Sequence, residues 1–149
     1  MINRQACVPE LSVSDINHSL SFYLDILLFK VDYQRPEDKF AMISLDDCQL
    51  MLEETNEHWK TGELVYPFGR GINFQIQVRE IDELYQRIKE HQYPIKAEIQ
   101  ENWYRADHVA IGQKEFLIMD PDGYLLRFAK HLGIRKLEDN SVMKNLDEN

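Results

Sequence analysis

The sequence predicts an α+β fold in which two βαβββ modules form a concave sheet cleft. One basis for this prediction is the Asp-Pro-Asp-Gly turn at 120–123, which joins two apolar runs. Proline presets one dihedral of such a turn and glycine accepts the positive φ that closes it, so residues 115–129 are expected to form a β-hairpin. The other basis is that a strand, a helix and a strand precede this hairpin, and the same order of elements occurs earlier in the chain.

The first module, residues 1–53, is expected to open with a strand over 7–13. Pro9 in this strand suits an edge or a bend, because proline cannot donate to a ladder. Ser14 and Asp15 are N-cap residue types, and apolar residues at helical spacing follow them. Three short strands separated by polar turns complete the module, at 29–33, 40–45 and 48–53.

The second module, residues 72–132, repeats this order after a long aromatic loop at 54–71 that is expected to pack against the fold. An alternating strand over 72–78 precedes a helix that ends before Pro94. A strand, a loop and the closing hairpin then follow, at 95–100, 101–114 and 115–129. The remaining residues, 133–149, are expected to form a polar, mobile tail.

The composition limits the classes of function. The chain has 149 residues and a net charge of −9, which argues against nucleic acid or an anionic membrane as a partner and leaves cationic ligands open. Its two cysteines, Cys7 and Cys48, make no disulfide framework, so we expect reduced thiols and a cytoplasmic location. No apolar stretch is long enough to span a bilayer, and the N-terminal residues lack the apolar core of a signal peptide.

The two modules can be aligned on their sequences, with 11–17 matching 76–82 and 47–52 matching 122–127. This alignment makes Leu52 equivalent to Arg127. A repeat of this kind implies two equivalent units, whose faces not covered by helices meet across a cleft.

Strand alternation predicts which residues line that cleft. It places polar residues of two strands on the concave side: Glu10 and Ser12 beside Val8, and Gln75 and Gln77 beside Asn73. The alternate residues, from Ile72 to Val78, are expected to pack on helices. A surface of amides, carboxylates and hydroxyls is not typical of a core, so it predicts a binding site.

A series of short motifs lies in order along the chain: Val8-Pro9, Asp15, Phe22, Asp25, Leu27, Phe29, Asp32, Phe40-Ala41, Asp82-Glu83-Leu84-Tyr85, Glu115-Phe116 and Asp120-Pro121. With the paired modules, they resemble the vicinal-oxygen-chelate superfamily, which includes glyoxalase I, extradiol dioxygenases, fosfomycin resistance enzymes and bleomycin resistance proteins. Within it the sequence is most similar to bleomycin resistance proteins, over roughly residues 6–130.

The resemblance implies where a metal would bind. The superfamily's enzymes hold a divalent metal at four concave positions, which fall here on Val8, Leu52, Asn73 and Arg127. Two of these side chains have no donor atom, a lone amide is a poor ligand, and a guanidinium repels a cation. The histidines lie on predicted helices, in loops or near the chain's end, where solvated side chains are expected. We therefore expect no metal, no cofactor and no enzymatic activity, with Glu10 as a general base if there were any.

The resemblance also implies a function, namely a homodimer with an exchanged N-terminal strand that sequesters a cationic or aromatic small molecule without altering it, as in antibiotic resistance. The implied ligand-binding residues are Glu10, Asp32, Tyr33, Phe40, Ser44, Glu53, Asn73, Gln75, Gln77, Trp103, Gly112 and Arg127. Asp32, Tyr33 and Phe40 match an acidic and aromatic wall, although a surface acid and two ordinary strand aromatics explain them equally.

The sequence departs from the bleomycin resistance proteins at two aromatic positions. Gln75 stands where similar family members have a stacking tryptophan, and Ile111 stands where an aromatic residue precedes the glycine. Trp103, Tyr104 or Trp59 would then supply aromatic surface. Two alternatives stay open: an enzyme of the same superfamily with atypical metal ligation, and a structural or regulatory dimer with a vestigial cleft.

Overall fold

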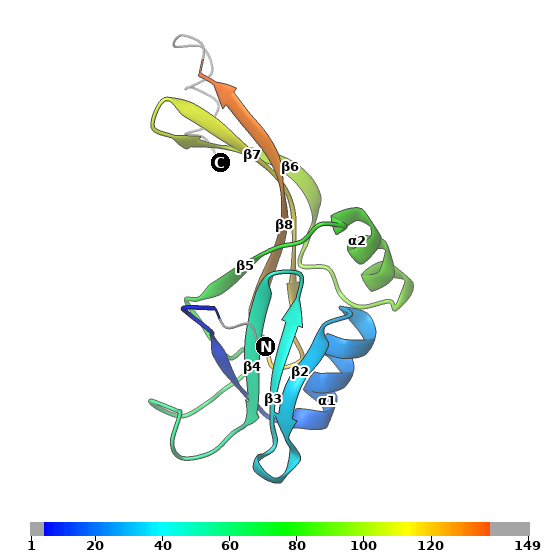
Figure 1. Cartoon of the computed structure of the whole chain (residues 1–149), viewed down its shortest axis with the longest axis vertical. Coiled ribbons are helices and arrows are strands. Elements are labelled where there is room, and N and C mark those ends of the chain that lie inside the picture. Colours follow the sequence, from blue (N-terminus) through cyan, green and yellow to red (C-terminus); the bar gives the residue numbers. More distant parts are fainter. Residues whose placement is uncertain (1–4, 138–149) are drawn as a thin grey trace.

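The computed structural model describes residues 5–137 as two four-stranded sheets with helices packed beside them (Figure 1). The first module consists of β1 (Glu10–Val13), α1 (Ile16–Leu20), the π-helix η1 (Ser21–Ile26), β2 (Lys30–Arg35), the 3₁₀ turn η2 (Pro36–Asp38), β3 (Phe40–Leu45) and β4 (Cys48–Glu54). The second consists of β5 (Asn73–Gln77), α2 (Ile81–Glu90), β6 (Ala97–Ala106), β7 (Val109–Met119) and β8 (Leu125–Lys136). Within this part of the chain, no helix is long and apolar enough to cross a membrane.

The two sheets have the same topology, with strand orders β1-β4-β3-β2 and β5-β8-β7-β6. In each sheet the first strand of the module pairs in parallel with the last, and the other neighbours are antiparallel. This equivalence confirms the predicted α+β fold of two βαβββ modules. The second sheet is longer, because the ends of β6, β7 and β8 extend beyond the body of the molecule as an arm (Figure 1).

Local sequence signals explain the two helices. The Asp15 carboxylate caps α1 by accepting hydrogen bonds from the backbone N–H groups of Asn17 (2.9 Å) and His18 (3.1 Å). The apolar residues of α2, namely Ile81, Leu84 and Ile88, recur at helical spacing and are all buried. Both helices therefore form where the sequence predicts them.

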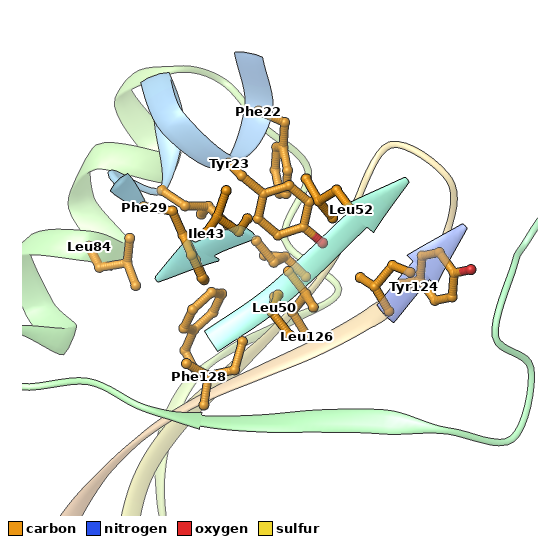
Figure 2. Close-up of a cluster of buried hydrophobic side chains, with 14 of the residues drawn as sticks. Phe22, Tyr23, Phe29, Ile43, Leu50, Leu52, Leu84, Tyr124, Leu126 and Phe128 are labelled. Carbon is orange, nitrogen blue, oxygen red and sulfur yellow. The ribbon is translucent and has the colours of Figure 1, made fainter. Parts of the chain in front are cut away.

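Both sheets pack their apolar faces into one shared core (Figure 2). Leu11 and Leu52 of the first sheet belong to the same buried cluster as Ile76 and Phe128 of the second. Because side chains alternate across a strand, the polar residues of each sheet lie on the face away from this core. Each polar face therefore points away from the shared core.

Hydrogen bonds join the modules at the closing turn of the second hairpin. Tyr23 donates from its hydroxyl to Asp120 Oδ2 at 2.8 Å, and Ser14 donates from its hydroxyl to Asp122 Oδ1 at 2.5 Å. Tyr124 returns a bond in the other direction, from its hydroxyl to the carbonyl of Ser12 at 2.9 Å. The Asp-Pro-Asp-Gly turn thus fixes the position of one module against the other.

Three expectations about the chain's course need adjustment. The loop predicted over 101–114 is wrong, because these residues form most of the β6–β7 hairpin. Alternation is hard to see there, since polar residues occupy both faces of the outer strands. Strand β8 continues past residue 133 to Lys136, and residues 138–149 of the expected tail lie outside the described residues. Strand β1 begins at Glu10 rather than at Cys7.

The aromatic loop 54–71 packs on the fold through only part of its length. The backbone N–H of Phe68 donates to the carbonyl of Asp122 at 2.8 Å, and its ring lies edge-on to Tyr124 at 6.0 Å. By contrast, Trp59 and Tyr66 remain 66% and 61% exposed. The loop therefore supports the second hairpin turn and leaves aromatic surface exposed.

Candidate functional site

The polar face of the first module is organised in rows across its four strands, because residues paired in register share a face. One row contains Ser12, Glu53, Phe40 and Arg35, and the next contains Glu10, Met51, Met42 and Tyr33. The pairing thus brings the predicted residues Glu10, Glu53, Tyr33 and Phe40 together on one surface.

Two carboxyl groups meet at the β1–β4 edge of this face. The side chains of Glu10 and Glu53 share a hydrogen bond, and the pKa of Glu10 is raised, first by burial and then by the neighbouring Glu53 charge. The Arg35 guanidinium opposes this increase. It lies 4.0 Å from the centroid of the Phe40 ring, which is itself 5.9 Å from the Tyr33 ring. The two acids, the partly exposed Tyr33 ring and one cation therefore share this face, with the Phe40 ring buried beneath the guanidinium at 3% exposure.

Asp32 extends this surface toward the other end of the sheet. The β2–β3 register shifts between Val31 and Tyr33, so Asp32 sits at an irregularity of the strand. Its carboxylate accepts hydrogen bonds from Ser44 Oγ at 2.8 Å and Gln49 Nε2 at 3.2 Å. The structure therefore places Asp32 and Ser44 in one network and adds Gln49, which the sequence did not predict.

The polar face of the second module is lined by amides around an arginine. Asn73, Gln75 and Gln77 alternate along β5, and Gln75 pairs with Arg127 of β8. Gln77 donates from Nε2 to Gln113 Oε1 at 3.2 Å. All four predicted residues of this module's first and last strands thus lie on one face.

Two further predicted residues lie on the other face of this sheet. Trp103 of β6 pairs with Gly112 of β7, and a Cβ atom at Gly112 would come within 2.5 Å of the indole ring. The guanidinium of Arg135 covers the same ring at 3.7 Å from its centroid. Gly112 is three residues from Glu115, so alternation puts the two on opposite faces. Within one chain, Trp103 and Gly112 therefore do not join the amide surface.

Sequence reasoning missed a buried carboxylate in the second module. Glu115, only 7% exposed, accepts a hydrogen bond from Asn102 Nδ2 at 2.9 Å and another from the Tyr104 hydroxyl. Alternation along β7 puts Glu115 on the polar face with Gln113. The signal was available, because residues 113, 115 and 117 alternate with the apolar 116 and 118.

The assignment of Leu52 to the polar face is wrong. Leu11 pairs with Leu52 in the first module, and Ile76, the equivalent of Leu11, pairs with Phe128 in the second. Leu52 is therefore equivalent to Phe128, and both side chains are fully buried in the core. A shift of one residue in an alignment reverses the face to which a strand residue is assigned. Met51, not Leu52, is therefore the residue of the first module that is equivalent to Arg127.

The donor set on the two polar faces does not suit a divalent metal. After this correction the four superfamily positions carry Val8, Met51, Asn73 and Arg127, of which only the amide is an oxygen ligand. Within residues 5–137, no three His, Cys, Asp or Glu side chains are grouped so that they could hold a metal ion. The residues present therefore do not fit the metal centre of the superfamily's enzymes.

A pocket of about 600 Å³ lies where the two modules meet. Gln49 of β4 lines it together with Asn73, Gln75 and Gln77 of β5, and Cys7 of the segment before β1 forms part of its wall. Within one chain, this pocket therefore brings the predicted site residues of β5 next to Gln49, which belongs to the Asp32 network of the first module.

The fold and its polar sheet faces define a two-module βαβββ protein, and comparison with known proteins assigns the family. The model of the glyoxalase/bleomycin resistance protein/dioxygenase superfamily matches residues 5–128, so the chain belongs to this superfamily. A bleomycin resistance protein of Geobacillus stearothermophilus is 29% identical over 139 residues, covering 84% of this chain and 96% of that protein.

Solved structures show the same fold. TioX from Micromonospora sp. ML1 has a TM-score of 0.65 at 19% identity, covering 87% of this chain and 100% of that one. A glyoxalase/bleomycin resistance protein/dioxygenase from Alicyclobacillus acidocaldarius has a TM-score of 0.62 at 20% identity, covering 89% of this chain and 96% of that one.

Proposed function

We propose that the chain is a non-catalytic binding protein of the bleomycin-resistance type that sequesters a cationic or aromatic small molecule in the cytoplasm. The observation that supports this most is the polar face of the first module, where the Glu10–Glu53 carboxyl pair lies on the same face as the partly exposed ring of Tyr33, and Phe40 lies buried beneath Arg35. A flat cation gains there from both charge and ring stacking.

The proposal includes a homodimer. Each polar face points away from the shared core, so the first-module face of one protomer and the second-module face of its partner can form the two walls of a cleft. In the single chain β1 pairs with β4, and the proposal adds that the partner's β1 takes this place in the dimer; Pro9, immediately before β1, cannot donate to a ladder and suits a change of chain direction at this point.

Sedimentation at micromolar concentration tests the dimer. We expect twice the mass of the 149-residue chain, and a monomer would refute the two-chain cleft. Deletion of residues 1–13, which removes β1 together with the segment before it, tests the exchanged strand separately. A dimer that persists after this deletion would reject the strand exchange and leave the two-chain cleft intact.

The alternative is a metal-dependent enzyme of the same superfamily, as the names of the matched family indicate. The thioether, amide and guanidinium of Met51, Asn73 and Arg127 favour the binding protein, because they do not form a coordination shell for Zn²⁺, Mn²⁺ or Fe²⁺. Elemental analysis after dialysis separates the two functions. One stoichiometric metal ion per chain would overturn the non-catalytic proposal and favour the enzyme.

Bleomycin is the first ligand to titrate, with tryptophan fluorescence as the readout at low and high salt. We expect binding that weakens with salt, because part of the attraction comes from exposed carboxylates. Gln75 lacks the stacking ring of similar family members, and the loss of one base–aromatic stack is worth ~1–3 kcal/mol, or roughly ten- to a hundredfold in affinity. The wild-type protein should therefore bind bleomycin weakly.

The Gln75→Trp variant restores an aromatic side chain to the amide face and should tighten this binding. Gln86→Trp is a matched control, since it adds the same ring on the exposed surface of α2, away from both polar faces. Equal tightening by both variants, or nanomolar and salt-insensitive binding by the wild-type protein, would contradict the proposed pocket.

A further inference from the structure

The polar face of the second module contains a buried acceptor that no side chain of the described chain satisfies. Glu115 is 93% buried, since its exposed fraction is 7%. Its Oε1 atom accepts two hydrogen bonds, from Asn102 Nδ2 at 2.9 Å and from the Tyr104 hydroxyl. Its Oε2 atom is shielded from solvent and has no partner within residues 5–137. An unsatisfied buried carboxylate oxygen is costly, so this atom is available to a ligand.

A buried donor lies beside it on the neighbouring strand. Arg127 Nε is shielded from solvent and also lacks a partner among the described residues. Leu117, two residues from Glu115 along β7, pairs directly with Arg127 of β8, so the two charged side chains leave the same face as diagonal neighbours. Burial and the Glu115 carboxylate raise the pKa of the Tyr104 hydroxyl and the Arg127 charge lowers it, which is consistent with both charges lying near this hydroxyl.

The two orphaned atoms define the chemistry of a group that would satisfy both. An ammonium would be attracted by Glu115 and repelled by Arg127, and a carboxylate would meet the reverse situation. An uncharged group with an N–H beside a C=O donates to Glu115 Oε2 and accepts from Arg127 Nε. Because the two protein charges cancel, such a group enters without burying a net charge.

We propose that this part of the second-module face binds a primary carboxamide or the equivalent edge of a ring amide. The inference rests on the proposed function in one respect, that the polar face is a ligand wall. It adds that the ligand's cationic or aromatic part lies on the first-module wall and its amide part lies here. Gln77 is exposed and lies in the same row as Glu115, across Ala129, so it is the side chain that turns aside to admit the group, while Tyr104 keeps its hydrogen bond to Glu115.

Three small probes with the same ring test this chemistry: benzamide, benzoate and benzylammonium. Ligand-detected NMR titrations of the full chain give their dissociation constants. We expect benzamide to bind at least about tenfold more tightly than either charged probe, the selectivity that one well-made buried hydrogen bond provides. Equal binding of the three probes, or a preference for a charged one, would overturn the inference without any variant being needed.

The Glu115→Gln variant sharpens the test, because the structure fixes how the new amide lies. Asn102 and Tyr104 both donate to the Oε1 position, so the glutamine carbonyl is held there and its NH₂ group takes the place of Oε2. The orphaned acceptor becomes a donor beside Arg127. Benzoate should then bind at least about tenfold more tightly than benzamide, which reverses the wild-type order.

Glu101→Gln is the matched control for this reversal. Glu101 pairs with Lys114, so it lies on the opposite face of the same hairpin, and its substitution changes the net charge equally. The control should keep the wild-type preference for benzamide. A reversal in both variants would show an effect of net charge and overturn the inference. Arg127→Met supplies a second variant, in which benzamide should lose at least about tenfold in affinity.

The failure of this inference and the failure of the proposed function are distinguishable. A permanent aromatic cation, phenyltrimethylammonium, reports on the first-module wall alone. If the cation binds and benzamide is not preferred, the amide site is wrong and the proposed function stands. A second outcome is that benzamide is preferred, that Glu115→Gln reverses this preference, and that neither the cation nor bleomycin binds. In that case the amide site stands and the proposed ligand class is wrong.

Discussion

Tyr23 of the π-helix η1 donates a 2.8 Å hydrogen bond from its hydroxyl to Oδ2 of Asp120, which begins the closing turn of the second module. Tyr23 is fully buried and Asp120 is 2% exposed. The other carboxylate oxygen of Asp120 accepts the backbone N–H groups of Asp122 and Tyr124, each at 2.9 Å. One buried carboxylate therefore holds its own turn and ties that turn to the first module.

Replacement of Tyr23 by phenylalanine should destabilise the protein. The variant keeps the aromatic ring in the core and leaves Asp120 Oδ2 buried without its side-chain donor, so we expect the free energy of unfolding to fall by about 1–3 kcal/mol. Urea denaturation measures the change. Tyr33→Phe is the control, because the Tyr33 hydroxyl has no hydrogen-bond partner among residues 5–137. This variant should lose little of its free energy of unfolding. Equal losses in the two variants would contradict a special role for the Tyr23 bond.

The same carboxylate should make stability depend on pH. Burial raises the pKa of Asp120 from its ordinary 3.8 to about 6, against the lowering effect of the hydrogen bonds from Tyr23 and the backbone. The folded state thus holds the Asp120 proton more tightly than the unfolded state does. Its contribution to stability is fully present below pH 3.8 and is lost as the pH rises through about 6.

Comparison with Asp120→Asn isolates this effect, since other carboxyl groups titrate in both proteins. The unfolding free energy of the wild-type protein relative to the variant should fall by on the order of 2 kcal/mol between pH 4 and pH 7. Urea denaturation at intervals across this range provides the measurement. A difference that stays constant, or rises with pH, would show that Asp120 has an ordinary or lowered pKa in the folded state.

The fold was predictable from sequence because its core elements carry strong periodic signals. The β3 and β4 hairpin and the α2 helix form where alternation and helical spacing place them. The hairpin of β6 and β7 was not recognised, because its outer part carries polar side chains on both faces and is held mainly by backbone pairing. Where neither face packs on a core, the sequence has little reason to alternate.

The faces of the site residues were harder to predict than the strands. The β3–β4 turn occupies residues 46–47, whereas the β7–β8 turn occupies 120–124, so an alignment through the two turns shifts one strand by a residue. This shift put Leu52 on the polar face. The face of Trp103 likewise depends on the register of β6, which includes an irregularity between Ala97 and Gln100 that no local pattern indicates.

The close approach of Trp103 to Gly112 predicts that Gly112→Ala will disturb the arm. The added Cβ would lie 2.5 Å from the indole ring, which Arg135 contacts at 3.7 Å, so the ring must leave its position. Because the displaced atoms are the far end of a partly exposed side chain, we expect a loss of stability of at most about 1 kcal/mol, the lower end of the range for overpacking. Tryptophan emission in a Trp59→Phe background reports on Trp103 directly.

Gly62→Ala is the control for this substitution, because a Cβ at Gly62 would have no heavy atom within 4 Å. We expect Gly62→Ala to leave both emission and stability unchanged. If Gly112→Ala also leaves the emission of Trp103 unchanged, the indole does not lie over Gly112 in solution.

The shared carboxyl pair predicts how cation binding depends on pH. Burial, the Glu53 charge and the Glu53 hydrogen bond all raise the pKa of Glu10, so Glu10 takes up a proton at a pH where an ordinary glutamate is still ionised. The affinity for phenyltrimethylammonium, whose own charge does not titrate, should therefore begin to fall early as the pH is lowered from 7 to 4.

In Glu10→Gln this early fall should be absent. The affinity of this variant at pH 7 should be roughly two- to fivefold lower than that of the wild-type protein, as for an exposed ion pair of about 0.5–1 kcal/mol. Glu63→Gln changes the net charge equally from the exposed loop and should behave as the wild-type protein does. Isothermal titration at each pH decides the matter, and a wild-type affinity that is independent of pH, or a Glu63→Gln protein that mimics Glu10→Gln, would place the cation away from the carboxyl pair.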